Sequence, residues 1–301
     1  MNYLIVIGGP TAAGKTGLAL TLARKYNSEI ISADSRQFYR EMNIGTAKPS
    51  KEELESIPHH FINTLGVEDS YDISQFEHGV LKLLKDKFRQ HNIMIMVGGS
   101  GLYHEAVIHG LDELPPRDEV IRRTLEQELN EKGLQPLQLE LKDRDPQTAA
   151  RIDLNNPLRV LRALEICRTS GQPYSSFIGK KKNTRDFKPL LMAVSPERST
   201  LYDRINNRVD EMIQTGLVEE VQSLLPYRSA NALRTVGYSE LFDYFDGKTT
   251  LEEAIDKIKQ HTRNYAKRQL TWFRNQSDYT LFDPQETEKI IDWIESNSIE
   301  K

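Results

Sequence analysis

The sequence predicts an α/β protein in which helices flank a parallel β-sheet. Apolar runs of strand length alternate with helical patterns along the chain, which is the order that builds a parallel sheet. A glycine-rich turn follows the first apolar run and precedes a helix. The pattern changes to helices alone between two sheet-forming parts, which indicates a helical insertion. We therefore expect an α/β core formed by 1–112 and 186–301, and a helical insertion domain at 113–185.

The glycine-rich turn has the spacing of a phosphate-binding loop, G-x-x-x-x-G-K-[ST]. Two glycines allow successive backbone N–H groups to converge on phosphate oxygens, and the helix expected over Lys15–Tyr26 directs its positive end there. We expect Lys15 to place a charge on the terminal phosphate and the hydroxyl of Thr16 to bind Mg²⁺. The loop predicts a phosphorylated ligand without identifying it. It consists of Gly9, Pro10, Thr11, Ala12, Ala13, Gly14, Lys15 and Thr16, after the apolar run Tyr3–Ile7.

Two further strands are expected to end beside this loop. Ser28–Ser35 reads as a second strand with Asp34 at its polar tip. Asn92–Val97 is a continuous apolar run, typical of a strand buried on both faces, and it leads into a second glycine-rich segment that includes Ser100. Because the carboxyl ends of parallel strands line the ligand crevice, these side chains should lie near the phosphate loop.

Helical patterns occupy most of the remaining chain, and the sheet resumes at Pro189–Val194. A lysine triplet at 180–182 stands near the exit of the insertion. The last long helix mixes basic and aromatic residues, a composition found both on nucleic-acid-binding surfaces and on solvated helices with an aromatic core side. The expected helices are Ser74–Gln90, Glu119–Lys132, Leu134–Lys142, Pro146–Ile152, Pro157–Thr169, Ser199–Thr215, Val218–Leu225, Ser239–Phe245 and Thr250–Asn275.

Composition narrows the class of protein. A net charge of −4 over 301 residues argues against a globally basic nucleic-acid binder, although it permits local basic patches. The single cysteine, Cys167, excludes an intramolecular disulfide and a cysteine-based zinc site. The first strand begins almost at the N-terminus and no apolar run reaches membrane-spanning length. We therefore expect a cytoplasmic protein without a membrane partner. We also expect a monomer.

Several stretches together resemble the tRNA dimethylallyltransferases, also called tRNA isopentenyltransferases, which prenylate an adenosine beside the anticodon. The resemblance covers nearly the whole chain and is far more specific than the phosphate loop alone. The zinc-finger extension of eukaryotic members is absent, so a bacterial-type enzyme is implied. Besides the phosphate loop, the matching stretches are Ala33–Gln37 with Tyr39, Asn43–Pro49, Val97–Tyr103, Asn156–Glu165, Val236–Tyr238 and Tyr265–Phe273.

The resemblance implies a P-loop kinase-like sheet and transfer of a dimethylallyl group from dimethylallyl diphosphate to N6 of adenosine 37 in tRNA. The phosphate loop would then hold the diphosphate with Mg²⁺, and Asp34 would take the proton from N6. Ser35, Arg36 and Gln37 would contact the flipped adenosine and its neighbours. Ser100, which stands where a threonine is frequent, would line the channel between the two substrates. Residues that match tRNA-contacting stretches are Arg122, Leu158, Arg159, Val160, Leu161, Arg162, Arg234, Gly237 and Tyr238.

Departure of diphosphate builds negative charge, so cations already aimed at it stabilise the transition state. Lys15 and Thr16 with Mg²⁺ are the first candidates, and Arg208 is a candidate for a further cation. Arg208 could instead be an arginine on a helix surface. Asp34 could instead cap a turn or bind Mg²⁺ through water.

Other functions remain open from the residues. A small-molecule kinase that transfers the γ-phosphoryl group of ATP is the main alternative, because the loop recognises phosphates and not a base. A non-catalytic nucleotide-binding switch is weaker, since no separate switch loops are apparent. Prenylation of free AMP or ADP is a close relative, but the helical insertion and the basic last helix favour a macromolecular acceptor.

Overall fold

The computed structural model describes residues 1–179 and 184–298, so the lysine triplet at 180–182 lies outside the described residues. The chain forms two compact units. The first, here called the core, consists of Met1–Ile108 and Arg185–Lys301, and the second, the inserted unit, is His109–Thr184. The inserted unit begins a few residues before the helical insertion expected at 113–185 and ends just before its last residue.

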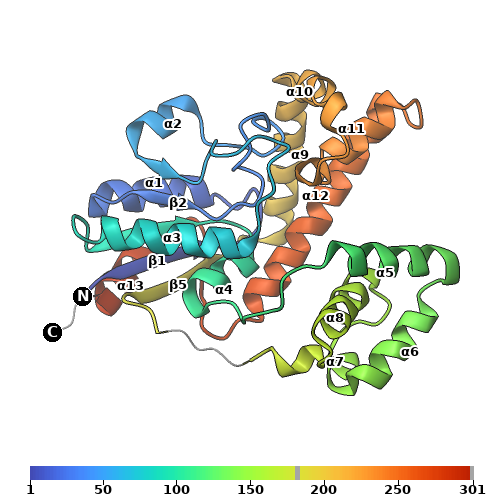
Figure 1. The fold of residues 1–301 in the computed structure, drawn as a ribbon. Coiled ribbons are helices and arrows are strands. Elements are labelled where there is room, and N and C mark those ends of the chain that lie inside the picture. Colours follow the sequence, from blue (N-terminus) through green and yellow to red (C-terminus); the bar gives the residue numbers. More distant parts are fainter. Residues whose placement is uncertain (180–183, 299–301) are drawn as a thin grey trace. The chain divides into compact units, whose positions relative to one another are not determined.

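Within the described residues, the core contains a parallel sheet of six strands in the order β3-β2-β4-β1-β5-β6 (Figure 1). β1 lies between β4 and β5 and is buried along its whole length, as its continuous apolar run predicts. β6 was not expected, because it is short and only half-buried. The strands are β1 (Tyr3–Gly8), β2 (Ile30–Ser32), β3 (His59–His60), β4 (Ile93–Val97), β5 (Lys188–Val194) and β6 (Thr280–Phe282).

Helices cover both faces of the sheet, and the alternation of β1 side chains shows the two apolar layers. Leu4 and Val6 enter one buried cluster, whereas Ile5 and Ile7 enter the other. α4 and α13 were not expected from the sequence, while α1, α3 and α9 to α12 lie close to their predicted positions. The core helices are α1 (Lys15–Tyr26), α2 (Lys51–Ser56), α3 (Ile73–Lys87), α4 (Gly101–His109), α9 (Arg198–Gln214), α10 (Leu217–Ser223), α11 (Tyr238–Phe245), α12 (Leu251–Arg274) and α13 (Thr287–Ser298).

The inserted unit is a helical bundle with its own apolar centre, which includes Leu125, Leu141 and Leu164. Asn156 caps α8 by accepting backbone N–H groups, with proline in the first turn and Gly171 in a left-handed conformation after the end. These local signals explain why the ends of this helix could be predicted. The bundle comprises α5 (Glu119–Lys132), α6 (Gln135–Arg144), α7 (Pro146–Arg151) and α8 (Pro157–Ser170) (Figure 1).

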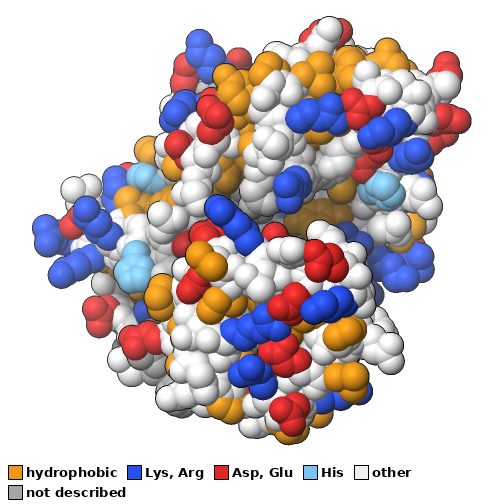
Figure 2. All heavy atoms as spheres, turned by 45° about the vertical axis from the view of Figure 1, so that its right-hand side comes forward, with side chains coloured by type: hydrophobic (Ala, Val, Ile, Leu, Met, Phe, Trp, Pro, Cys, Tyr) orange, Lys and Arg blue, Asp and Glu red, His pale blue; other side chains and the backbone are white. Residues whose placement is uncertain are grey.

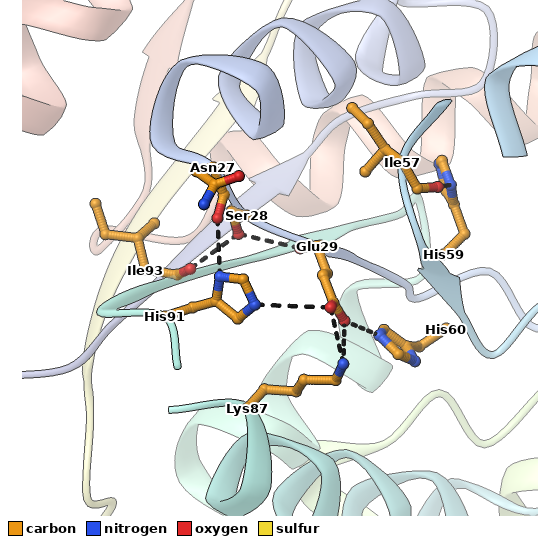
Figure 3. Close-up of polar contacts among 9 residues, drawn as sticks. All are labelled: Asn27, Ser28, Glu29, Ile57, His59, His60, Lys87, His91 and Ile93. Carbon is orange, nitrogen blue, oxygen red and sulfur yellow. Dashed lines mark hydrogen bonds and ion pairs between the residues drawn. The ribbon is translucent and has the colours of Figure 1, made fainter. Parts of the chain in front are cut away.

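A charged cluster joins β2, β3 and α3 of the core at the amino-terminal edge of the sheet. Glu29 Oε2 lies 2.6 Å from His60 Nε2 and 2.7 Å from Lys87 Nζ, and Glu29 Oε1 lies 3.6 Å from His91 Nε2 (Figure 3). Burial alone raises the pKa of Glu29, but hydrogen bonds from Lys87 and His60 outweigh this effect and lower it. This carboxylate therefore ties two short strands to the end of a helix.

The described surface carries charges of both signs. On the face drawn in Figure 2, lysine and arginine side chains are interspersed with aspartate and glutamate. Among the described residues, no helix combines the length and apolarity that a bilayer crossing requires.

Candidate active site

A cavity of about 640 Å³ lies in the core at the carboxyl ends of β1, β2 and β4. Parallel strands deliver the residues that follow them to one edge of a sheet, which explains why segments distant in sequence meet here. α9, α12 and the segment before α11 complete the walls. The predicted site residues that line it are Thr11, Ala12, Ala13, Gly14, Lys15, Thr16, Asp34, Ser35, Arg36, Gln37, Arg208, Arg234 and Gly237.

The phosphate loop has the positive-φ backbone conformation that its glycines permit. Gly9 has φ +134° and Gly14 has φ +87°. A Cβ atom at position 9 would lie 2.7 Å from the carbonyl oxygen of Val194 on β5, so a side chain there would displace the loop from the sheet. α1 begins at Lys15, so its free N–H groups face the cavity. The loop therefore has the geometry of an anion site.

Lys15 is held inside the loop. Its Nζ donates a hydrogen bond of 2.5 Å to the carbonyl oxygen of Pro10. Burial lowers the pKa of Lys15 to about 7; the nearby Asp34 carboxylate opposes this shift, and Arg208 adds to it. The ammonium group is thus poorly stabilised by its surroundings, and an anion in the cavity would stabilise it.

Arg208 projects from α9 toward the phosphate loop, where its Nη1 lies 3.4 Å from Thr11 Oγ1. Burial lowers the pKa of its guanidinium group. The alternative of an arginine on the outer surface of a helix is therefore wrong. Its position suits a second cation on a bound phosphate.

Gln269 on α12 is a site residue that sequence reasoning did not select. Its Oε1 accepts the backbone N–H of Thr11 at 2.9 Å, and its Nε2 donates to the carbonyl oxygen of Gly99 at 3.0 Å. One buried side chain thus connects the phosphate loop with the segment after β4. The sequence offered one signal, a glutamine within the matching stretch 265–273. Nothing in the sequence indicates which groups this side chain contacts.

Asp34 lines the cavity and accepts the backbone N–H of Arg36 at 2.9 Å through Oδ1. The turn-capping contact considered as an alternative is therefore present, and it occupies one lone pair of one oxygen. Tyr265 on α12 lies close to Asp34, and burial raises the pKa of its phenol to about 12, with Asp34 adding to the shift and a hydrogen bond with Ser100 opposing it. Ser100 itself is half-buried beside this tyrosine.

Gln37 has its amide fixed on both sides. Its Oε1 accepts the Ser32 hydroxyl at 2.9 Å, and its Nε2 donates to the carbonyl oxygens of Thr46 and Ala47 at 3.3 Å each. All four residues line the cavity. The second lone pair of Oε1 remains available to a ligand.

The stretch of α8 that is predicted to contact tRNA, Leu158–Arg162, has some side chains on the surface and others in the centre of the inserted unit. Leu158 is 68% exposed and Arg159 is exposed, whereas Val160 and Leu161 are buried in the centre of the inserted unit. The expectation that the side chains of Val160 and Leu161 contact tRNA is therefore wrong, because successive residues of a helix point to different faces.

Two arginines of the inserted unit share a buried carboxylate. Arg162 lies 2.9 Å from Glu165 Oε1, and Arg122 lies 3.6 Å from Glu165 Oε2 and 2.6 Å from Glu126. Both guanidinium groups remain partly exposed, so each can also contact a phosphate.

The stretch before α11 contributes Arg234, which is exposed at the cavity, and Gly237, whose N–H donates to Glu240 at 2.8 Å. Tyr238 is fully buried, and its hydroxyl donates to Glu220 at 2.7 Å. The side chain of Tyr238 cannot meet tRNA directly, which corrects that expectation.

The donor set at the loop suits Mg²⁺. Within the described residues, no cluster of three histidine, cysteine or acidic side chains could hold a metal ion. Mg²⁺ commonly uses one or two protein oxygens together with phosphate oxygens and water. The Thr16 hydroxyl and the Asp34 carboxylate both line the cavity and fit this pattern.

Comparison with known proteins identifies the family. Residues 37–276 match the family model described as IPP transferase. A tRNA dimethylallyltransferase of Christiangramia forsetii is 51% identical over 296 residues, which cover 98% of each chain. This chain belongs to the tRNA dimethylallyltransferase family. One of Cytophaga hutchinsonii is 45% identical over 98% of this chain and 97% of that relative.

Solved structures agree. A full-length tRNA isopentenylpyrophosphate transferase from Bacillus halodurans aligns with a TM-score of 0.72 at 40% identity, covering 98% of this chain and 96% of that one. A eukaryotic dimethylallyltransferase acting on tRNA aligns with a TM-score of 0.78 at 28% identity, covering 99% of this chain and 77% of that one. The predicted P-loop kinase-like fold and the predicted transferase class are confirmed. Membership in a tRNA dimethylallyltransferase family argues against the kinase and switch alternatives.

Proposed function

We propose that this chain transfers the dimethylallyl group of dimethylallyl diphosphate to N6 of adenosine 37, beside the anticodon of tRNA, and releases diphosphate. The observation that carries the proposal is one cavity lined both by a phosphate loop and by Asp34 with the polar residues that follow β2. Relatives over nearly the whole chain are named for the same reaction. A tRNA substrate supports action in the cytoplasm, and the monomeric state stays a prediction.

On the donor side, the loop amides, Lys15 and Arg208 would hold the diphosphate. The bond between the allylic carbon and the diphosphate oxygen breaks, so negative charge grows on the group that these cations face. Bound Mg²⁺, held by the Thr16 hydroxyl together with diphosphate oxygens, would supply further positive charge there. The loop does not read a base, so ATP should bind weakly and inhibit.

On the acceptor side, the adenine must leave the anticodon-loop stack to reach the cavity, which costs a few kcal/mol. The N6 lone pair forms the new bond to the allylic carbon, and Asp34 takes the proton that N6 loses. Ser35, Arg36 and Gln37 line the same wall and would orient the base. N6 becomes acidic only as the bond forms, so a carboxylate is a sufficiently strong base for this step.

The test is prenyl transfer to tRNA that lacks the modification, with ATP absent. We expect transfer, inhibition by pyrophosphate that is competitive with the donor, and a stronger inhibition with Mg²⁺. Asp34→Asn should lower turnover by about 10²-fold or more while pyrophosphate binding stays normal. A requirement for ATP, or pyrophosphate inhibition that is not competitive, would contradict the assignment. Near-normal turnover of Asp34→Asn would remove this residue from the mechanism.

A further inference from the structure

Two stretches that resemble the family have no place in the chemistry described so far, residues 43–49 and 236–238. They are far apart in sequence, yet both reach the same carboxylate. This carboxylate belongs to Glu220, a half-buried residue of α10 that the sequence analysis did not select.

Glu220 makes four hydrogen bonds within the core. Its Oε2 accepts the backbone N–H groups of Asn43 at 2.9 Å and Ile44 at 2.8 Å. Its Oε1 accepts the N–H of Gly45 at 3.0 Å and the hydroxyl of Tyr238 at 2.7 Å. Hydrogen bonds to an ionised acceptor are roughly twice as strong as neutral ones, so the carboxylate fixes this backbone turn firmly.

The ring of Tyr238 packs against the same turn at Gly45. Its ring is fully buried, and a Cβ atom at position 45 would lie 2.6 Å from its Cε2 atom. Burial raises the pKa of Tyr238, with the negative charge of Glu220 adding to the effect, so its hydroxyl remains a donor. Only glycine at position 45 lets the turn rest on the tyrosine ring. The two stretches thus form one packed unit around Glu220.

The residues that follow Gly45 in this turn form hydrogen bonds with the side-chain amide of Gln37. The carbonyl oxygens of Thr46 and Ala47 accept both contacts from Gln37 Nε2, and the Ser32 hydroxyl fixes Gln37 Oε1 from the other side. A shift of the turn would therefore rotate or release the amide. Since Gln37 lines the cavity on the same wall as Asp34, such a shift would change the surface that an acceptor base meets.

We propose that Glu220 is a positioning residue for the acceptor base: it fixes the turn at 43–47, and this turn holds the amide of Gln37 in the orientation that meets the target adenosine. The inference rests on the proposed transfer to tRNA. Glu220 acts through Gln37 and is not expected to touch either substrate. A misplacement of about 1 Å at a reacting centre can lower a rate by about 10²-fold, so an indirect role can have a large effect.

The first experiment compares Glu220→Gln with Glu219→Gln, which removes the same charge from an exposed neighbour on the same helix. In Glu220→Gln we expect kcat to fall about tenfold or more. The Kd of tRNA should change less than about threefold, because phosphate contacts dominate tRNA affinity. The Kd of pyrophosphate should be unchanged. Glu219→Gln should match the unaltered protein in all three measurements.

The second experiment asks whether Glu220 acts through Gln37. In a Gln37→Ala background, Glu220→Gln should lower kcat by less than about twofold, because the amide that it positions is absent. Tyr238→Phe, which keeps the ring and removes one hydrogen bond, should lower kcat less than Glu220→Gln does. Additive effects of Glu220→Gln and Gln37→Ala would overturn the inference.

Two other outcomes would also overturn it. Normal kcat in Glu220→Gln would show that the turn needs no carboxylate. Loss of pyrophosphate binding together with kcat would show that Glu220 supports the whole core instead of the acceptor side. Failure of the unaltered protein to prenylate tRNA would contradict the proposed function itself, so the two failures are distinguishable.

Discussion

Lys15 is the residue whose charge state depends most directly on a ligand. Its pKa is lowered to about 7 by burial, so above pH 7 the side chain is mostly neutral in the free protein. A bound diphosphate stabilises the ammonium form and raises this pKa, so binding takes up a proton above pH 7. The affinity for pyrophosphate should therefore fall by about tenfold between pH 6 and pH 8 through this group alone.

Calorimetric titration of pyrophosphate at several pH values checks this prediction. Pyrophosphate itself titrates in the same range, so Lys15→Arg is the matched control, because an arginine keeps its charge throughout. The difference in slope between the two proteins isolates Lys15. Equal slopes would mean that Lys15 is already charged at pH 8.

The phosphate loop and Asp34 could be predicted because their signals are local: a fixed spacing, a strand before it and a helix after it. Glu220 and Gln269 could not, because most of their partners are backbone groups far away in sequence, and a carboxylate or an amide on a helix does not indicate which groups it contacts. Val160 and Leu161 illustrate a different error. The matching stretch Asn156–Glu165 cannot form one continuous surface, because a helix turns residues three and four positions apart toward the same side.

Among the elements, β2 and β3 are the shortest strands near the site, and the Glu29 cluster holds them to α3. Glu29→Gln should lower the free energy of unfolding at pH 7 by about 2 kcal/mol, since it removes a carboxylate bonded to Lys87 and His60. The pKa of Glu29 is lowered, so this stabilisation is complete above its unfolded value and disappears as the pH falls through the folded one. The difference between the two proteins should therefore fade below about pH 4.5.

Calorimetric unfolding at several pH values measures this difference, which corresponds to about 3 °C at pH 7 for a chain of this length. Glu55→Gln on α2 is the control, because its contact with Lys51 is exposed and 3.9 Å long. Such a surface pair contributes about 0–1 kcal/mol. A loss that is equally small in Glu29→Gln would show that the cluster adds little stability.

The ends of helices could be predicted where capping residues mark them. Glu119–Lys132 begins and ends where it was expected, since Asp118 caps it and Gly133 follows it. β6 was missed because the strand has only three residues and its pairing with β5 is a tertiary contact. The order of the strands is likewise set by crossovers that periodicity does not reveal.

For the whole molecule, tRNA binding should depend on basic residues in both units. Changing Arg159 and Arg162 to alanine should weaken tRNA binding and make its dependence on salt less steep, by about one unit of slope for each phosphate that is no longer neutralised. The pair Lys267 and Arg268 on α12 should behave in the same way. Pyrophosphate binding should be unchanged in both variants.

Filter binding or fluorescence titration over a range of salt concentrations provides the slopes. Lys142→Ala, an exposed charge on α6 outside the predicted contact residues, controls for the removal of a positive charge. Arg162 is already paired with Glu165, so Arg159 should contribute more of the effect. An unchanged slope in both double variants would mean that these are ordinary surface charges.

The position of the inserted unit within the chain also affects how the protein is made. β1 leaves the ribosome first, but its neighbour β5 pairs with it from Lys188 onward, and the amide of Gln269 reaches Thr11 later still. At about 10 residues per second, the first strand waits roughly 20 s for this partner. The inserted unit has its own apolar centre and can become compact during that interval. Nascent chains therefore expose the unpaired edge of β1 until residues 188–194 have been translated, and this is the period in which a chaperone would protect them.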